Sequence, residues 1–237
     1  DHRVRVRFDA PNAGDTVRAK EPYELTPRPA VPIQGGEGWM ESQPIATTHN
    51  QGVVTAGDLA FYNRGLPEHE ALTDENGVIN EIALTLFRSV GYLSRGNLAT
   101  RPGWAGPGVA TPEAQMIGKN TYEFAVGFGG QQVAGDVITK SYDYFHRAEH
   151  GFAGANINGL FDVTMSRAIE MPALRPTADG AAVIARFSNP DDEPVKITLS
   201  GAFANAVECA YDGTPIDSAV DMHQFELARG ITTIRIS

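Results

Sequence analysis

The stretch GLPEHEALTDENGVINEIALTLFRSV, residues 65–90, indicates how this chain folds. Alternate positions near its end carry Ile82, Leu84 and Leu86 on one side, and Ala83, Thr85 and Phe87 on the other. An extended segment with two apolar faces is typical of a central strand between two layers. The preceding Asn76-Gly77 pair favours a tight turn back to a strand through 70–72, so we expect a β-meander.

The composition extends this picture to the whole chain. Its 237 residues are 42% hydrophobic and include 25 glycines and 15 prolines, which excludes a disordered chain and indicates a folded protein rich in turns. Further short alternating segments are separated by turn pairs such as Asn189-Pro190 and Asp212-Gly213. We therefore expect an all-β protein, in which the strongest helix candidate, 136–150, could equally be a strand followed by a loop.

Two domains are expected from the change of composition along the chain. The segment SRAIEMPALRPTADG, 166–180, contains two prolines and few large apolar residues, so it is interpreted as a linker or crossing. It would separate a large β-domain, 1–165, from a small terminal β-sandwich, 181–237. A unit of about 60 residues encloses little core, and the small domain is therefore expected to lean on a neighbour.

Charge and cysteine content disfavour several kinds of partner. The formal net charge of -10 argues against nucleic acid and against an anionic membrane surface, since both need positive potential. In RVRVR, 3–7, the arginines share one face of a strand, and a solvated or interface-facing row is favoured over a phosphate site. The single cysteine, Cys209, suits a buried thiol and a reducing, cytoplasmic location. No apolar run is long enough to predict a transmembrane helix.

Several longer segments of the sequence resemble one enzyme family. They are Phe61–Gln115, the opening DHRVRVRF (1–8), the interior IARFSNPDDEPVKITL (184–199) and the closing ITTIRI (231–236). In this order they resemble the C-terminal half of glycoside hydrolase family 38, the retaining α-mannosidases. The resemblance covers nearly the whole chain, and nothing in it matches the family's catalytic domain. That domain is expected to precede Asp1, where the lack of an initiating methionine fits a boundary.

The resemblance implies a fold, a function and partners. The large domain would be a supersandwich of the galactose mutarotase type. The parent enzyme would use zinc, an Asp nucleophile and an acid/base carboxylate, all outside this chain. No cofactor is therefore expected here, and the chain alone would be inactive. Its partners would be its own N-terminal catalytic domain and a mannoside or other carbohydrate, and a homo-oligomer is compatible with this arrangement.

The segment after the predicted central strand is the strongest candidate for function in this chain. YLSRGNLATRPGWAGPGVATPEAQ, 92–115, is too long and too rich in Gly and Pro for a simple turn. The resemblance places such a loop near the catalytic pocket, where Arg can donate to sugar hydroxyls and an indole can stack on a pyranose. The predicted pocket-rim residues are Arg95, Arg101, Trp104 and Gln115. An equally supported alternative is that the loop only packs on the missing domain.

The histidine motifs indicate packing rather than chemistry. His146 and His150 have the i, i+4 spacing of zinc ligands on a helix, but no third ligand is evident, so surface histidines are favoured over a metal site. His69 lies between Glu68 and Glu70, yet neighbours in a strand point to opposite faces. The family commonly has an aromatic residue at this position, and a packing role is therefore predicted for His69.

Arg88 is predicted to form a structural ion pair. Regular alternation puts it on the face of Ile82 and Leu84, where an unpaired guanidinium would be costly. Glu68 or Glu70, on the neighbouring strand of the meander, would supply a bidentate partner.

Two other classes of function stay open at this point. One is a stand-alone carbohydrate-binding β-sandwich module that stacks sugars on Trp104 and Trp39, although interface packing is favoured for Trp39. The other is a mutarotase-like epimerase. It needs a His and a carboxylate that converge on one anomeric carbon, and no pair of strands in the sequence supplies them.

Overall fold

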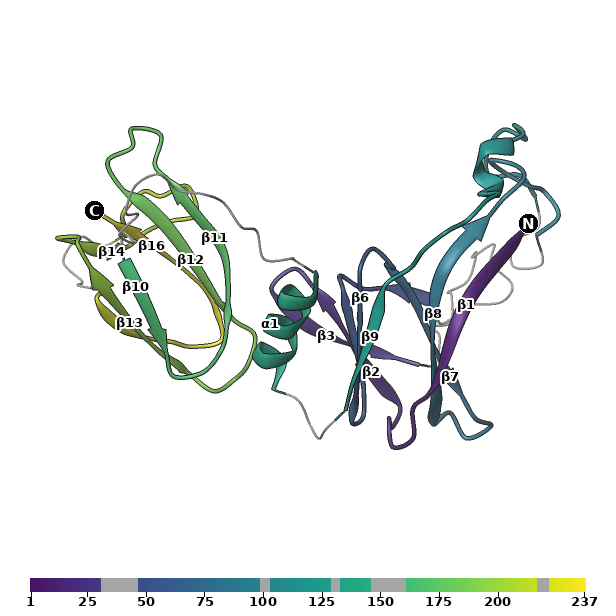
Figure 1. The fold of residues 1–237 in the computed structure, drawn as a ribbon, viewed down its shortest axis with the longest axis horizontal. Coiled ribbons are helices and arrows are strands. Elements are labelled where there is room, and N and C mark those ends of the chain that lie inside the picture. Colours follow the sequence, from purple (N-terminus) through teal and green to yellow (C-terminus); the bar gives the residue numbers. More distant parts are fainter. Residues whose placement is uncertain (31–46, 99–102, 129–132, 146–160, 217–221) are drawn as a thin grey trace. The chain divides into compact units, whose positions relative to one another are not determined.

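The computed structural model describes residues 1–30, 47–98, 103–128, 133–145, 161–216 and 222–237. Within these ranges the chain is built mainly of strands, with the α-helix α1 (Ala134–Phe145) and the short 3₁₀-helix η1 (Pro112–Gln115) (Figure 1). The strands form four sheets. The expected all-β class is therefore confirmed. In the described part of 136–150 the chain is helical, and His146 and His150 lie outside the described residues.

The chain divides into two compact units, and the division differs from the expected one. The first unit comprises Asp1–Glu21 and Thr26–Gln131, and the second comprises Pro22–Leu25 and Gln132–Ser237. The expected linker, 166–180, contains the strand β11 (Glu170–Pro176), which pairs with β12 (Val183–Asn189) in the second unit. A strand can hold these prolines because β11 lies at the edge of its sheet. The register of β11 against β12 also shifts between Glu170 and Ala173, around Pro172.

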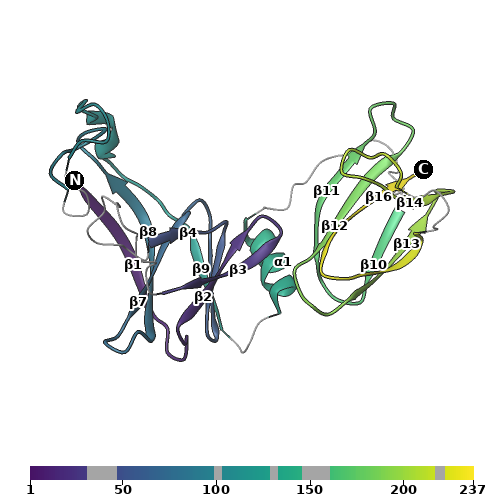
Figure 2. The same ribbon diagram turned by 180° about the vertical axis from the view of Figure 1, so that it is seen from behind.

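The first unit consists of two sheets. One sheet has the strand order β1-β8-β7-β4, and the other has the order β3-β2-β5-β6-β9. The strands of the first sheet are β1 (His2–Asp9), β8 (Ile79–Ser89), β7 (Glu68–Thr73) and β4 (Thr47–His49), the last labelled in Figure 2. Those of the second are β3 (Glu24–Pro29), β2 (Thr16–Glu21), β5 (Val53–Ala56), β6 (Leu59–Asn63) and β9 (Phe124–Phe128).

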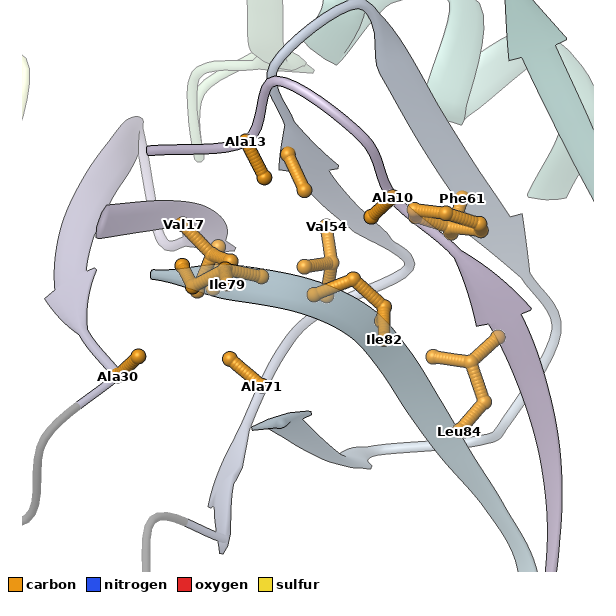
Figure 3. Close-up of a cluster of buried hydrophobic side chains, with 12 residues drawn as sticks. Ala10, Ala13, Val17, Ala30, Val54, Phe61, Ala71, Ile79, Ile82 and Leu84 are labelled. Atoms are coloured by element: carbon orange, nitrogen blue, oxygen red, sulfur yellow. The ribbon is translucent and has the colours of Figure 1, made fainter. Parts of the chain in front are cut away.

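A buried apolar cluster joins these two sheets. Figure 3 shows Ile79, Ile82 and Leu84 of β8 facing the side chains of Val54 and Phe61 from the other sheet. All five are almost completely buried. Removing such apolar surface from water is the main favourable term in folding, so this cluster is the core of the first unit.

The predicted meander is confirmed in β7 and β8, which pair antiparallel. The turn between them is closed by Asp74, whose carboxylate accepts hydrogen bonds from the backbone N–H of Asn76 at 2.9 Å and of Val78 at 3.0 Å. Gly77 follows with φ of 82°, a conformation that side-chain-bearing residues rarely adopt. The Asn-Gly signal in the sequence therefore marks a real turn.

A β-bulge in β8 changes the side on which Arg88 lies. Val4 of β1 pairs with Phe87, but the next residue, Arg5, pairs with Thr85, so Leu86 is an extra residue. Such an insertion reverses the alternation beyond it. Arg88 therefore pairs with Arg3 and lies on the solvent-facing side of the sheet, not on the side of the core as regular alternation predicted.

The second unit is a smaller sandwich of two sheets with its own core. One sheet has the order β10-β13-β15, and the other has the order β11-β12-β16-β14. The remaining strands are β10 (Phe161–Met165), β13 (Val195–Gly201), β14 (Ala206–Glu208), β15 (Gln224–Leu227) and β16 (Gly230–Ile236). The cluster between them includes Phe187, Ile197 and Ile234. Cys209, which follows β14, is a free thiol and is 3% exposed.

Helix α1 belongs to this second unit through its first turn. The carboxylate of Asp191 accepts hydrogen bonds from the N–H groups of Ala134 and Gly135, at 3.0 and 2.9 Å. These N–H groups have no partner inside a helix, so a carboxylate at this end stabilises it. At the other end, the Tyr142 hydroxyl donates to Glu170 of β11.

Candidate functional site

The predicted functional loop follows β8 and is a folded structure, not a simple connection. Leu93 donates its N–H to the carbonyl of Val109 at 2.8 Å, and Thr111 donates to Gly91 at 2.9 Å, so the two arms of the loop pair with each other. The loop then enters η1. In Figure 1 this region lies beside the N-terminus of the chain. The backbone hydrogen bonds therefore give the described part of this loop a defined structure.

Arg95 is tied to the first residue of the chain. Its Nη2 lies 2.6 Å from Oδ2 of Asp1, and its guanidinium carbon lies 5.1 Å from the centre of the Tyr92 ring. The other carboxylate oxygen of Asp1 accepts a hydrogen bond from the N–H of Gly91. Arg95 thus joins the loop to β1, and only part of its donor capacity is left for a ligand.

Trp104 presents its indole at the surface against two glycines. The side chain is 64% exposed. A Cβ atom at Gly96 would lie 2.6 Å from the indole Nε1, and one at Gly108 would lie 2.7 Å from Cζ3. Such distances are too short for a real contact, so the indole holds its position because both residues lack a side chain. Tyr92, Arg95 and Asn97 line an open hollow with Trp104.

Gln115 lies near Arg95 but contributes to the loop mainly through its backbone. Its carbonyl accepts a hydrogen bond from Ser89 Oγ at 3.0 Å. A Cβ at Gly91 would be 3.5 Å from both Gln115 Nε2 and Arg95 Nη2, which brings these two side chains to the same place. Arg101 lies outside the described residues, as does Trp39.

The loop and the two residues that follow η1 expose several apolar side chains. Tyr92, Leu93 and Ile117 are 46%, 65% and 95% exposed. Leu98, Val109 and Met116 are exposed as well. A gathering of exposed apolar groups in one segment indicates a surface that contacts another molecule or domain. The structure therefore supports contact by this loop and is compatible with both sequence-based alternatives, a pocket rim and packing alone.

Arg88 contacts Glu68, one of its two predicted partners. Their Nη1 and Oε2 atoms are 3.1 Å apart, and the Arg88 side chain is 62% exposed. Glu68 also accepts a hydrogen bond from Thr85 at 2.7 Å. Burial raises the pKa of Glu68, but the hydrogen bonds from Thr85 and Arg88 outweigh it and leave this pKa below its ordinary value. An ion pair this exposed contributes little to stability.

Glu70 instead forms the centre of the charged face. It contacts Arg3 at 3.0 Å, and it also pairs with Arg5. The side chain of Glu70 is only 17% exposed. Arg3 and Arg5 of β1 thus pair with the glutamates of β7, while Arg7 pairs with Glu81 of β8 at 2.6 Å, which agrees with a solvated or interface-facing row. Strand alternation predicts the face that these glutamates share.

His69 is fully buried on the opposite face of β7. Its Nδ1 lies 3.5 Å from Asn50 Nδ2, and its Nε2 has no hydrogen-bond partner within the described part of the chain. Burial, together with the charges of Arg28 and His49, lowers the pKa of His69 to about 4. A neutral imidazole without access to solvent cannot act on a substrate, and these observations support the predicted packing role.

The described ranges contain neither a cluster of metal ligands nor a membrane-spanning helix. No group of three or more His, Cys, Asp or Glu side chains is placed there to hold a metal ion. Among the same residues, no helix has the length and apolar character needed to cross a membrane.

Sequence reasoning missed the residues that position the side chains of Arg95 and Trp104. Asp1 lies far from Arg95 in the sequence, and only the pairing of β1 with β8 brings the two together. The sequence does contain a pattern that points to Gly96 and Gly108, because glycines lie on both sides of the tryptophan in RGNLATRPGWAGPG. By itself that pattern indicates a loop, whereas in the structure it forms a seat for the indole.

Comparison with known proteins gives a consistent picture. No family model matches the sequence. A protein of Halalkalibacterium halodurans named "Putative mannosylglycerate hydrolase" is 28% identical over 204 residues, which are 81% of this chain and 20% of that protein. The similarity thus spans about a fifth of the relative's length.

Two solved structures share the fold of the whole chain. An α-mannosidase from Enterococcus faecalis V583 matches with a TM-score of 0.70 and 23% identity, over 100% of this chain and 26% of that one. A protein in glycosyl hydrolase family 38 from Enterococcus faecalis matches with a TM-score of 0.71 and 22% identity, over the same shares. The fold expected from the sequence resemblance is therefore confirmed, and it accounts for about a quarter of each larger structure.

Proposed function

We propose that this chain is the C-terminal β-region of a glycoside hydrolase of the family 38 type, which acts on α-mannosides. The observation that carries the proposal is the match of the entire chain to only a quarter of two much longer structures, one of which is named an α-mannosidase. The relative similar in sequence is also named for a mannosyl compound. A region of this kind supports an enzyme whose chemistry lies in another domain.

The role of the loop after β8 is to complete the rim of the substrate pocket. Trp104 offers an exposed indole face for stacking on a sugar ring. Arg95 shares its hollow and is held by Asp1, so it can orient the loop while its remaining N–H groups donate to sugar hydroxyls. Gln115, close to Arg95, is proposed as a further rim residue. The apolar side chains of the loop would pack on the catalytic domain.

Zinc and the retaining chemistry belong to that other domain in this proposal. Retaining glycosidases need two carboxyl groups about 5 Å apart across the scissile bond. The described residues of this chain offer no group that fits a zinc ion, so no catalytic step is assigned to them. The chain alone is expected to be inactive.

The test compares this chain with the full-length enzyme. Purified residues 1–237 should not hydrolyse 4-nitrophenyl α-mannoside or mannosylglycerate with added zinc, whereas the full-length protein should hydrolyse at least one. In the full-length enzyme, Trp104→Ala should raise KM more than it lowers kcat, because a stacking contact mainly holds the substrate. Hydrolysis by residues 1–237, with contaminating full-length enzyme excluded, would overturn the proposal.

A stand-alone carbohydrate-binding module is the alternative, and the exposure of Trp104 favours it. Calorimetric titration of residues 1–237 with mannose and mannobiose separates the two functions. Binding that Trp104→Ala abolishes would support a module. No binding, or binding that Trp104→Ala leaves unchanged, together with a Trp104 effect on the full-length enzyme, would support the pocket rim.

A further inference from the structure

A polar groove lies on the outer face of the sheet β11-β12-β16-β14 in the second unit. Arg175 of β11 and Arg235 of β16 both lie opposite Ile184 of the central strand β12, one on each side. The two arginines therefore project from the same face of the sheet. Their Cα atoms are about 10 Å apart, which follows from the spacing of neighbouring strands.

Two turns closed by aspartates form the sides of this groove. Asp179, between β11 and β12, accepts hydrogen bonds from Thr177 Oγ1 at 2.6 Å and from the N–H of Ala181 at 3.1 Å. Asp212 accepts one from the N–H of Thr214 at 2.9 Å. The open hollow between the turns is lined by residues that include Arg175, Thr177, Asp179, Asp212, Thr214 and Arg235.

The charges of the groove balance. The hydrogen bond from Thr177 keeps the pKa of Asp179 below its ordinary value, and the backbone of Thr214 does the same for the pKa of Asp212. Both carboxylates are therefore ionised at neutral pH. Within the described parts of the chain, neither Arg175 nor Arg235 forms a side-chain ion pair, so both guanidinium groups keep donors for a ligand.

The turn that carries Asp212 is held rigidly on the sheet. Arg186 is buried, and its guanidinium lies 3.6 Å from the centre of the Tyr211 ring. It also donates to the carbonyl of Tyr211 at 3.0 Å and to Thr233 Oγ1 at 3.1 Å. A Cβ at Gly213 would lie 3.1 Å from Ile184, so the turn packs closely on the strand below. A site held in this way binds at a lower entropic cost.

We propose that this groove binds a neutral saccharide. Two guanidinium donors and two carboxylate acceptors in one hollow match the alternating donors and acceptors of sugar hydroxyls. The groove carries no net charge, because its two guanidinium groups balance its two carboxylates, so we expect an uncharged ligand rather than a sugar phosphate or a uronic acid. Tyr211, next to Asp212 in the chain, is 69% exposed and offers an aromatic ring at the same turn. This site is independent of the pocket rim and lies in the other unit.

The experiment is calorimetric titration of residues 1–237 with mannobiose, maltose, and the anionic probes mannose 6-phosphate and glucuronic acid. At least one neutral disaccharide should bind in the millimolar range. Arg235→Gln and Arg175→Gln should each weaken it about tenfold, the loss expected when one charged hydrogen-bond donor is removed. Arg175→Lys should weaken it less, because the positive charge is kept.

Two control variants distinguish this groove from the pocket rim and from unspecific binding. Lys196→Ala, on the other sheet of the same unit and 72% exposed, should leave the affinity unchanged. Trp104→Ala should also leave it unchanged, and the thermal unfolding of each variant shows whether it is folded. The proposal is overturned by absence of binding to both neutral sugars, by stronger binding of the anionic probes, or by loss of binding in Trp104→Ala alone. Activity of the full-length enzyme does not bear on any of these outcomes.

Discussion

At the scale of single residues, the indole of Trp104 can occupy its position because Gly96 and Gly108 have no side chains. We expect Gly108→Ala to displace the indole, because the new methyl group would lie 2.7 Å from Cζ3. The measurement is the emission spectrum of Trp104 in a Trp39→Phe background, where it is the remaining tryptophan. The stability of the first unit should change by less than about 1 kcal/mol, since the loop lies outside the core.

Gly106→Ala is the matched control for this change. It lies in the same loop, but a Cβ there would meet only Ser94 Cβ at 3.7 Å, an ordinary contact. Its emission spectrum should match that of the parent protein. Equal spectral shifts in the two variants would show that the loop is merely sensitive to any added methyl group.

His69 predicts how the stability of the first unit depends on pH. Its pKa is lowered to about 4, below the ordinary value of 6.5, so the unfolded chain binds the proton more readily. The free energy of unfolding should therefore fall as the pH drops from 7 to 5, by about 2 kcal/mol. Urea unfolding at the two pH values measures this, and His69→Phe should reduce the fall.

His2→Gln serves as the comparison, because His2 is exposed and is not among the charges that lower the pKa of His69. This variant should keep the pH dependence of the parent protein. If His69→Phe and the parent protein lose equal stability between pH 7 and pH 5, the buried imidazole is not the source of the pH dependence.

At the scale of elements, the ion pairs on the sheet of β1, β8 and β7 differ in burial, and we expect their contributions to stability to differ accordingly. Arg88→Ala should cost about 0.5 kcal/mol or less, because the pair with Glu68 is exposed. Glu70→Ala should cost about 1–2 kcal/mol, since it removes the carboxylate that pairs with the partly buried Arg5 and leaves Arg3 with Glu68 alone. Urea unfolding of the two variants measures the difference. Equal losses would contradict the ranking.

The strands that the sequence predicted are those whose signal is local. The Asn76-Gly77 turn and the alternation in β8 need only neighbouring residues, and both are found in the structure. The position of Arg88 could not be predicted, because an extra residue at Leu86 shows only when β1 pairs with β8. The prolines of β11 led to the prediction of a linker for a related reason. An edge strand can contain proline, but the sequence does not show which strand lies at the edge of a sheet.

The same distinction applies to the candidate site. The loop was located from its length and its glycines, and Trp104 and Arg95 do line one hollow there. The partner of Arg95, however, comes from the start of the chain, and such a contact depends on the whole fold. Local sequence patterns thus located the loop, and the tertiary structure determined which N–H donors of Arg95 remain available.

At the scale of the whole molecule, each unit has its own buried cluster. Ile82→Ala should destabilise the first unit and Ile234→Ala the second, each by about 2–5 kcal/mol, because both side chains are completely buried. Amide hydrogen exchange measures both effects in one sample. We expect the loss of protection to stay within the mutated unit, because the two clusters share no residue. Loss of protection in both units from either change would contradict this.

The burial of Cys209 has a practical consequence for measurements on the intact protein. It is the single cysteine of the chain, and burial raises the pKa of its thiol, so thiol-directed dyes react with it slowly. Cysteines introduced at exposed positions, such as Glu113→Cys in the first unit and Asp162→Cys in the second, would therefore be labelled selectively. Energy transfer between two such dyes would then report the distance between the units in solution, with and without a sugar.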